Sequence, residues 1–239
     1  DSPHLEAALA QWEEALTGDL APVLTPERVP SEACGGFGAD IAGTATDDLI
    51  LIVNITEIDG IGEVLGRAGP CLIRDEVAGL PAVGILTLDA ADLRGMAAEG
   101  GQLVKHVLTH EIAHVLGFGA LWEDQELVSG AGASDPRFTG ALAVAEWQAL
   151  GRTGSVPLET QGGEGTAEVH WRESVFGDEL MTGFAEQAGI FQPLSRVSIA
   201  SMADLGYEVD YAAADAFSLT QSLRASGAGL ENLGWDELY

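Results

Sequence analysis

The spacing of apolar residues along this chain predicts helices at some positions and strands at others. The apolar positions of a first helix, which we expect to reach about Thr17, are Leu5, Leu9, Trp12 and Leu16. Two stretches rich in Ile, Leu and Val, at 48–58 and 82–88, predict strands. A proline-containing stretch at 22–30 and a segment rich in Gly, Ser, Asp and Pro at 129–136 predict surface connections, and a short helix is expected at 140–150.

The clearest helical pattern covers 102–116, where apolar residues occupy most of the helix circumference. These residues are Leu103, Val104, Val107, Leu108, Ile112, Val115 and Leu116. A distribution of this kind is typical of a buried helix and not of an amphipathic surface helix. Gly117 then provides a C-terminal stop in the left-handed conformation.

Polar residues with metal-binding chemistry interrupt this buried helix. His110 and His114 are four residues apart, so both rings lie on one helix face and are able to share one ion. Glu111 lies roughly 100° round the helix from His110, outside the ligand set but near enough to take a proton from a metal-bound water. Burying two histidines without partners is unfavourable, and metal coordination removes that conflict.

Catalytic zinc usually takes three protein ligands, so a third ligand must come from elsewhere. His106 lies about 12 Å from His114 along the helix axis, too far for both to reach one ion, and we interpret it as a core or partly exposed histidine. His4 lies near the chain terminus, which leaves His170 as the favoured third ligand. A downstream glutamate is the alternative, and the candidates are Glu123, Glu126 and Glu146.

The segment from His110 to Phe118 resembles the active-site helix and glycine turn of the metzincin zinc peptidases, and within that group the leishmanolysin-like family. Most metzincins place the third histidine three residues after the glycine, where this chain has Ala120. The leishmanolysin branch carries an insertion there, and 55 residues separate His114 from His170 in this chain.

The likeness resumes at His170-Trp171 and again at 179–183, within a region that extends from about residue 12 to residue 211. It includes Leu194-Ser195-Arg196 and Asp204-Leu205-Gly206-Tyr207. Met181 is similar to the methionine of the metzincin Met-turn, which implies an apolar floor under the ligand histidines. Taken alone, a methionine is usually core filler.

The resemblance implies an α+β, metzincin-like fold in one metallopeptidase catalytic domain that covers 1–239. A twisted mixed sheet and the buried active-site helix would form an N-terminal lobe at about 1–119. The insertion and a smaller irregular C-terminal lobe, with the third histidine and the Met-turn, would follow at about 120–239. The resemblance further suggests that the strand at 82–88 is an edge strand above the cleft, which pairs with extended substrate.

These residues indicate a zinc-dependent endopeptidase that acts on polypeptides. His110, His114 and His170 would hold one catalytic Zn²⁺ ion and leave one position for a water, whose pKa zinc lowers to near 7. Glu111 would act as general base. The alternatives are a catalytically silent, zinc-stabilised binding or adhesion module, against which the intact Glu111 argues, and an accidental motif in a metal-free scaffold.

Composition excludes several other functions. The chain of 239 residues has 10 basic and 38 acidic residues, and its net charge of -28 disfavours nucleic acid as a partner. No apolar run is long enough for a transmembrane segment, and no GxSxG or Walker-type motif occurs. The glycines of 60–66 do not fit a dinucleotide fingerprint and predict a turn. Calcium has no supporting EF-hand motif, and the oligomeric state has no sequence signal.

The two cysteines, Cys34 and Cys71, predict a structural disulfide and therefore an oxidising compartment. Two buried free thiols are an alternative, as is a thiol that masks the zinc in a latent form. Because the chain begins at Asp1 and not at Met, we expect a secreted or extracellular product whose signal or prosegment is not part of this sequence.

Overall fold

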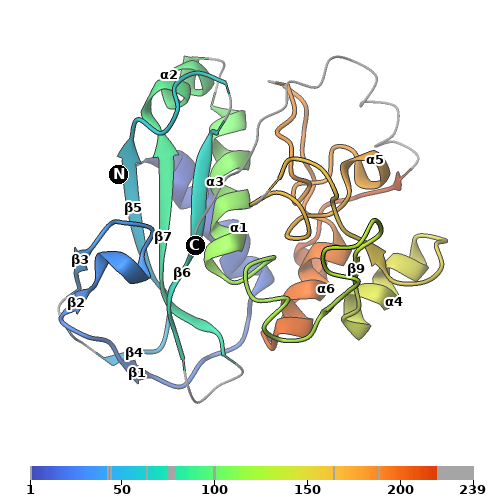
Figure 1. Ribbon diagram of the computed structural model, residues 1–239, viewed down its shortest axis with the longest axis horizontal. Helices are drawn as coiled ribbons and strands as arrows, with labels where there is room; N and C mark the ends of the chain where they lie inside the picture. The colour runs from blue at the N-terminus through green and yellow to red at the C-terminus, as the bar shows by residue number, and fades with distance from the viewer. Residues whose placement is uncertain are drawn as a thin grey trace.

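A computed structural model describes residues 2–41, 43, 45–62, 64–74, 79–98, 101–163, 165–187 and 189–219. These residues form a mixed α+β fold of helices and small sheets, as the fold class predicted from the sequence requires. Figure 1 shows the largest sheet in the N-terminal part and mostly helices and irregular segments in the C-terminal part. Residues 220–239 of the predicted domain lie outside the described residues.

The predicted helices are present, with ends that differ by one or two residues. The helices are α1 (Pro3–Ala15), α2 (Ala90–Ala98), α3 (Gln102–Val115), α4 (Ala141–Ala149), α5 (Glu173–Phe176) and α6 (Arg196–Leu205), with 3₁₀ turns η1 (Ser31–Ala33) and η2 (Tyr211–Ala213). No helix within the described ranges combines the length and the apolar character that a membrane span requires.

The strands belong to one larger sheet and three small ones. They are β1 (Val23–Leu24), β2 (Arg28–Val29), β3 (Ala39–Asp40), β4 (Ala45–Thr46), β5 (Ile50–Thr56), β6 (Gly66–Ile73), β7 (Pro81–Asp89), β8 (Val128–Ser129), β9 (Arg137–Phe138) and β10 (Val156–Pro157). The segment predicted as a connection at 22–30 therefore contains two strands of two residues each.

The larger sheet has the order β5-β7-β6, with β5 parallel and β6 antiparallel to β7. The prediction that 82–88 forms an edge strand is therefore wrong, because β7 is the central strand. All nine of its residues are buried, as expected for a strand covered on both faces. The strand that lies beside α3 at one edge of the sheet is β6. The sequence did not predict this strand, because Gly66, Gly69, Pro70 and a bulge interrupt its alternation of apolar and polar residues.

Helix α3 lies between the sheet and α1, with every residue from His106 to Val115 buried (Figure 1). The indole N–H of Trp12 in α1 donates a hydrogen bond of 2.8 Å to the carbonyl of Thr109. Gly117 has a φ of 104°, which confirms the left-handed stop after the helix. Contacts with the sheet on one side and with α1 on the other therefore position α3 without any contribution from a ligand.

An aromatic cluster joins the segment after α3 to the C-terminal part. Phe118 and Trp122 have ring centroids 4.4 Å apart, and Trp171 lies 5.3 Å from the first and 4.9 Å from the second. All three side chains are fully buried within the main hydrophobic core. One continuous core therefore runs through both parts of the described chain.

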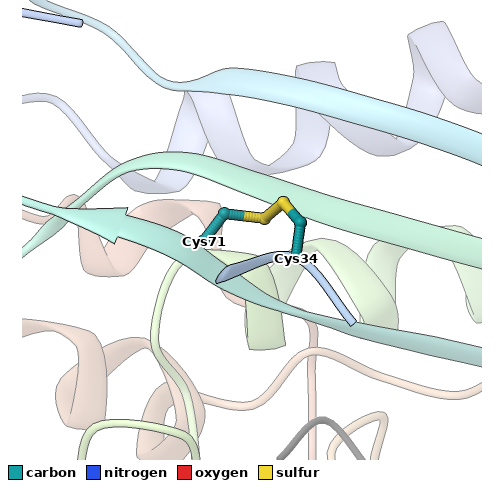
Figure 2. The surroundings of a disulfide bond; sticks show 2 residues. All are labelled: Cys34 and Cys71. Atoms are coloured by element: carbon teal, nitrogen blue, oxygen red, sulfur yellow. A yellow bond between two sulfur atoms is a disulfide. The ribbon is translucent and has the colours of Figure 1, made fainter. Parts of the chain in front are cut away.

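Cys34 and Cys71 form a disulfide with a Cα–Cα distance of 4.9 Å. Figure 2 shows that the bridge links the segment after η1 to strand β6. The predicted pairing is confirmed, and the alternatives of free thiols or a zinc-masking thiol are wrong. Closing this loop of the unfolded chain contributes about 3 to 4 kcal/mol to stability on the chain-entropy model.

Candidate metal centre

Three histidine rings meet at one buried point. The Nε2 atoms of His110 and His114 are 2.9 Å apart, and those of His114 and His170 are also 2.9 Å apart. The third distance, between the Nε2 atoms of His110 and His170, is 3.1 Å. The first two histidines come from α3 and the third from a segment far along the chain, and all three are buried.

Backbone carbonyls fix the orientation of each ring. The Nδ1 atom of His110 lies 2.7 Å from the carbonyl oxygen of Leu180. For His114 the partner is the Phe118 carbonyl at 2.9 Å, and for His170 it is the Thr166 carbonyl at 3.0 Å. A carbonyl oxygen only accepts hydrogen bonds, so each Nδ1 must carry the ring proton.

This tautomer leaves three Nε2 lone pairs facing one another. Such lone pairs repel unless a cation lies between them, and three neutral imidazoles are a donor set that zinc prefers. Ideal tetrahedral ligands with Zn–N bonds of about 2.1 Å would be about 3.4 Å apart, close to the observed spacing. Carbonyl partners on the far nitrogen are also typical of metal-binding histidines. The residues present therefore fit a zinc ion.

The protonation state of the three rings also favours metal binding. Burial lowers the pKa of His114 to about 4, against the opposing effect of its bond to Phe118. Burial also holds the pKa of His110 and His170 well below the usual range, and the neighbouring imidazoles lower both further. All three rings are thus neutral near pH 7, which is the form that binds metal.

Glu111 lies next to this cluster with 1% of its surface exposed. Its Oε1 atom has no hydrogen-bond partner among the described residues, and burial raises the pKa of the carboxyl well above its usual range. A positive charge at the histidines would oppose that rise, because it favours the carboxylate. Gly66 at the start of β6 passes close by, since a Cβ atom built on it would lie 3.2 Å from Oε1.

Close packing and hydrogen bonds position His170. Gly119, with a φ of 71°, lies against the carbonyl of Val169, and a side chain at this glycine would collide with it. The carbonyl of His170 accepts a bond of 2.9 Å from the amide of Glu159. Gly162, Gly163 and Gly165, which precede His170, have positive φ, and Glu164 between them lies outside the described residues. The turn after α3 therefore contacts the segment that carries the third ring.

Glu179 is a positioning residue that the sequence did not reveal. Its buried carboxylate accepts bonds from the Ser195 amide at 3.0 Å, the Ser198 hydroxyl at 2.5 Å and the Met181 amide at 2.6 Å. Burial raises the pKa of Glu179, and these bonds oppose the rise. The carboxylate fixes the chain on both sides of Leu180, whose carbonyl orients His110. The only available signal was an acidic residue directly before two apolar ones.

The other ligand candidates lie elsewhere. In the described part of the chain, His110, His114 and His170 form the histidine group, and none of the three candidate glutamates belongs to it. Glu146 forms an ion pair of 2.8 Å with Arg196, whereas Glu123 and Glu126 are exposed.

His106 and Met181 are both buried. His106 is buried with its ring 5.6 Å from that of Phe191, and burial lowers its pKa to about 4, so the interpretation as a core histidine agrees with the structure. Met181 is fully buried, and its backbone carbonyl accepts a bond of 3.0 Å from the Trp171 amide. Its role as an apolar floor under the histidines stays a prediction.

Comparison with known proteins identifies the family. A family model described as leishmanolysin matches residues 33–226, which is most of the chain. The chain belongs to the leishmanolysin family of peptidases. The resemblance predicted from the histidine motif is therefore confirmed.

Individual family members match over different lengths. Leishmanolysin of Leishmania donovani is 32% identical over 200 residues, which cover 77% of this chain and 32% of the relative. The leishmanolysin homolog of Crithidia fasciculata is 30% identical over 68% of this chain and 24% of its own length. The leishmanolysin-like peptidase of Drosophila melanogaster is 45% identical over 58 residues, which are 24% of this chain and 8% of that protein. The chain spans about a third or less of the length of these relatives.

Proposed function

We propose that this chain is a zinc-dependent endopeptidase and that the described parts belong to one catalytic domain of the metzincin type. His110, His114 and His170 would hold one zinc ion. The observation that carries this proposal is the set of three Nε2 atoms aimed at one point while a backbone carbonyl fixes each Nδ1 proton. Membership of a peptidase family supports peptide bonds as the substrate.

A zinc ion in this site would supply a Lewis acid that lowers the pKa of water to near 7 and polarises the peptide carbonyl. Glu111 then takes the proton of the attacking water and passes it to the leaving amine. Its buried carboxylate lacks a competing hydrogen bond at Oε1, so it is available for that transfer. The histidines themselves stay neutral and do not exchange protons.

Extended substrate would pair with β6, not with β7. Strand β6 is at an edge of the sheet and begins at Gly66, directly beside Glu111. Main-chain pairing along an edge strand binds polypeptides with little dependence on their sequence. The absence of a side chain at Gly66 lets the substrate backbone and the base lie close together.

A secreted or extracellular location fits the disulfide between Cys34 and Cys71, because such bonds persist in oxidising compartments. The net charge of -28 agrees with polypeptide substrates and disfavours nucleic acid.

The decisive experiment measures zinc content and cleavage of unfolded casein in parallel. The samples are the wild type, Glu111→Gln, and the exposed control Glu123→Gln. We expect one zinc per chain in all three and at least about 100-fold slower cleavage only in Glu111→Gln.

Two results would contradict the proposal. Zinc in all samples without cleavage in any would favour a catalytically silent binding module. A wild type that binds no zinc would remove the basis of the mechanism.

A further inference from the structure

Three carboxylates gather at the end of the sheet where β5 and β7 finish. Asp59 follows β5, Asp89 is the last residue of β7, and Asp92 lies in the first turn of α2. One oxygen from each lies within 4.8 Å of the others. Asp89 and Asp92 are buried, whereas Asp59 is exposed, so the group is open to solvent on one side only.

Hydrogen bonds from four backbone amides stabilise the negative charge of Asp89. Its Oδ2 accepts from the amides of Ile58 at 2.6 Å and Asp59 at 3.3 Å. Its Oδ1 accepts from the amides of Ala91 at 2.6 Å and Asp92 at 3.1 Å. Burial acts to raise the pKa of Asp89, but these four bonds outweigh it and lower the pKa. Asp89 is therefore ionised near pH 7 although it is buried.

The carboxylate of Asp92 is much less well stabilised by hydrogen bonds than that of Asp89. Its Oδ1 accepts one bond of 3.0 Å from the Gly62 amide, but Oδ2 is buried without a hydrogen-bond partner among the described residues. The side chain belongs to a residue with 7% exposure, and the ion pairs found in the described ranges involve none of the three aspartates. Burial raises the pKa of Asp92, the Gly62 bond opposes this, and the charges of Asp89 and Asp59 raise it further.

A buried carboxylate oxygen without a donor, next to two other carboxylates, lacks the compensation that buried charges normally have. A cation that is bound by oxygens of Asp92 and Asp59, next to the negative charge of Asp89, would supply it. Oxygen ligands select hard ions, which excludes zinc as the preferred occupant. Magnesium demands near-ideal octahedral geometry, whereas calcium tolerates the irregular arrangement of carboxylates from three different elements.

We propose that Asp59, Asp89 and Asp92 form a calcium site. This site is separate from the histidine cluster and does not depend on the proposed peptidase activity. It would tie the segment after β5 to the start of α2. The amide of Asp89 also donates a bond of 2.9 Å to the carbonyl of Leu65, the residue before Gly66. Calcium would therefore stabilise the start of β6, close to Glu111.

The test compares the wild type with Asp92→Asn, which keeps the shape of the side chain but removes its charge. Asp48→Asn is the matched control, because Asp48 is an exposed acid before β5. Each full chain is dialysed into buffer freed of divalent cations and titrated with CaCl₂ in a calorimeter. Thermal unfolding is then recorded with and without calcium, and zinc content is measured in the same samples.

We expect one calcium per chain in the wild type and the control. At about 100 times the dissociation constant, the midpoint of unfolding should rise by about 5 to 10 °C. Asp92→Asn should lose this rise. Without calcium it should unfold at the same temperature as the wild type or higher, since it relieves repulsion between carboxylates. An aspartate that only supports the fold would instead give a lower midpoint in both conditions.

Three results would overturn the proposal. They are a wild type that gives no heat with CaCl₂, an Asp92→Asn variant that keeps the full calcium-dependent rise, and binding of MgCl₂ without binding of CaCl₂. None of these results changes the zinc content, so they are distinguishable from a failure of the peptidase proposal.

Discussion

Helix α3 and the segment 159–183 bring their histidines to the same point by different means. In α3, the helical backbone places the side chains of His110 and His114 on one face, four residues apart. In the described residues around His170, strand pairing is limited to isolated bridges of Trp171 with Leu158 and Thr182. Two buried carboxylates bind backbone amides there instead: Glu179 accepts from Met181 and Ser195, and Glu159 accepts from Thr160, Gln161 and Glu173. An irregular ligand segment is therefore positioned by polar side chains in its interior, whereas a helix is positioned by its own backbone hydrogen bonds.

The largest expected effect tests whether both segments are needed. His114→Ala and His170→Ala should each lose zinc and slow casein cleavage by more than about 100-fold, beyond the loss seen when only a hydrogen-bonding partner of a ligand is removed. Zinc analysis of purified variants and a cleavage assay measure this. If His170→Ala kept full zinc occupancy, α3 alone would be the metal site and the comparison would fail.

The second largest effect is expected when the buried carboxylate of Glu179, in the segment 159–183, is replaced. Glu179→Gln places an amide where Ser195, Ser198 and Met181 donate, so at least one donor loses its acceptor. We expect the zinc affinity to fall by about 10- to 100-fold and the free energy of unfolding by about 2 to 3 kcal/mol. Competition with a chelating dye and urea denaturation measure the two. Unchanged zinc affinity would show that the Leu180 carbonyl does not need this support.

A pH effect tests a buried carboxyl group in the same segment. Burial raises the pKa of Glu173 to about 8, and the charges of Glu186, Glu159 and Asp178 reinforce the rise. The folded state then holds a proton that the unfolded state releases near pH 4.5, the ordinary pKa of a glutamate. Stability contributed by this group is therefore present at low pH and falls as the pH rises towards 8.

Glu173→Gln should remove that dependence. The variant should be more stable than the wild type at pH 8 by about 1 to 3 kcal/mol, and the difference should shrink towards pH 5. Urea denaturation at a series of pH values gives the comparison. A constant difference between the two proteins across this range would contradict the assignment.

The smallest effect is expected on the helix side. Trp12→Phe removes the indole bond to the Thr109 carbonyl and should lower the free energy of unfolding by about 1 kcal/mol. Zinc affinity should stay unchanged, because the helical backbone sets the spacing of its two ligands. A clear loss of zinc affinity would show that α3, like the other segment, relies on side-chain support.

The difference between the helix and the irregular segment also explains which parts of the site could be predicted from the sequence. His110, Glu111 and His114 follow from helical periodicity and from the chemistry of a shared ion. His170 follows from the number of ligands that zinc takes, but its placement depends on contacts such as Gly119 against Val169. The carbonyl partners of the rings have no sequence signature, because any residue supplies a carbonyl.

The wrong prediction for 82–88 and the features that were not predicted also depend on contacts between segments far apart in the chain. A short apolar stretch such as 82–88 does not reveal whether a strand is central or at an edge, since only the neighbouring strands decide this. Strand β6 has too many glycine and proline residues to show alternation. Asp59, Asp89 and Asp92 are separated by unequal distances in the chain and meet only after β5, β7 and α2 have packed together.

The aromatic cluster gives the junction of the two segments an optical signal. Trp122 follows α3 and Trp171 follows His170, and their indole rings are 4.9 Å apart. Transitions of two rings in contact couple, and the coupling depends on their distance and mutual angle. Circular dichroism in the aromatic region should therefore change when the two ligand-bearing segments separate, and it can be recorded without a substrate.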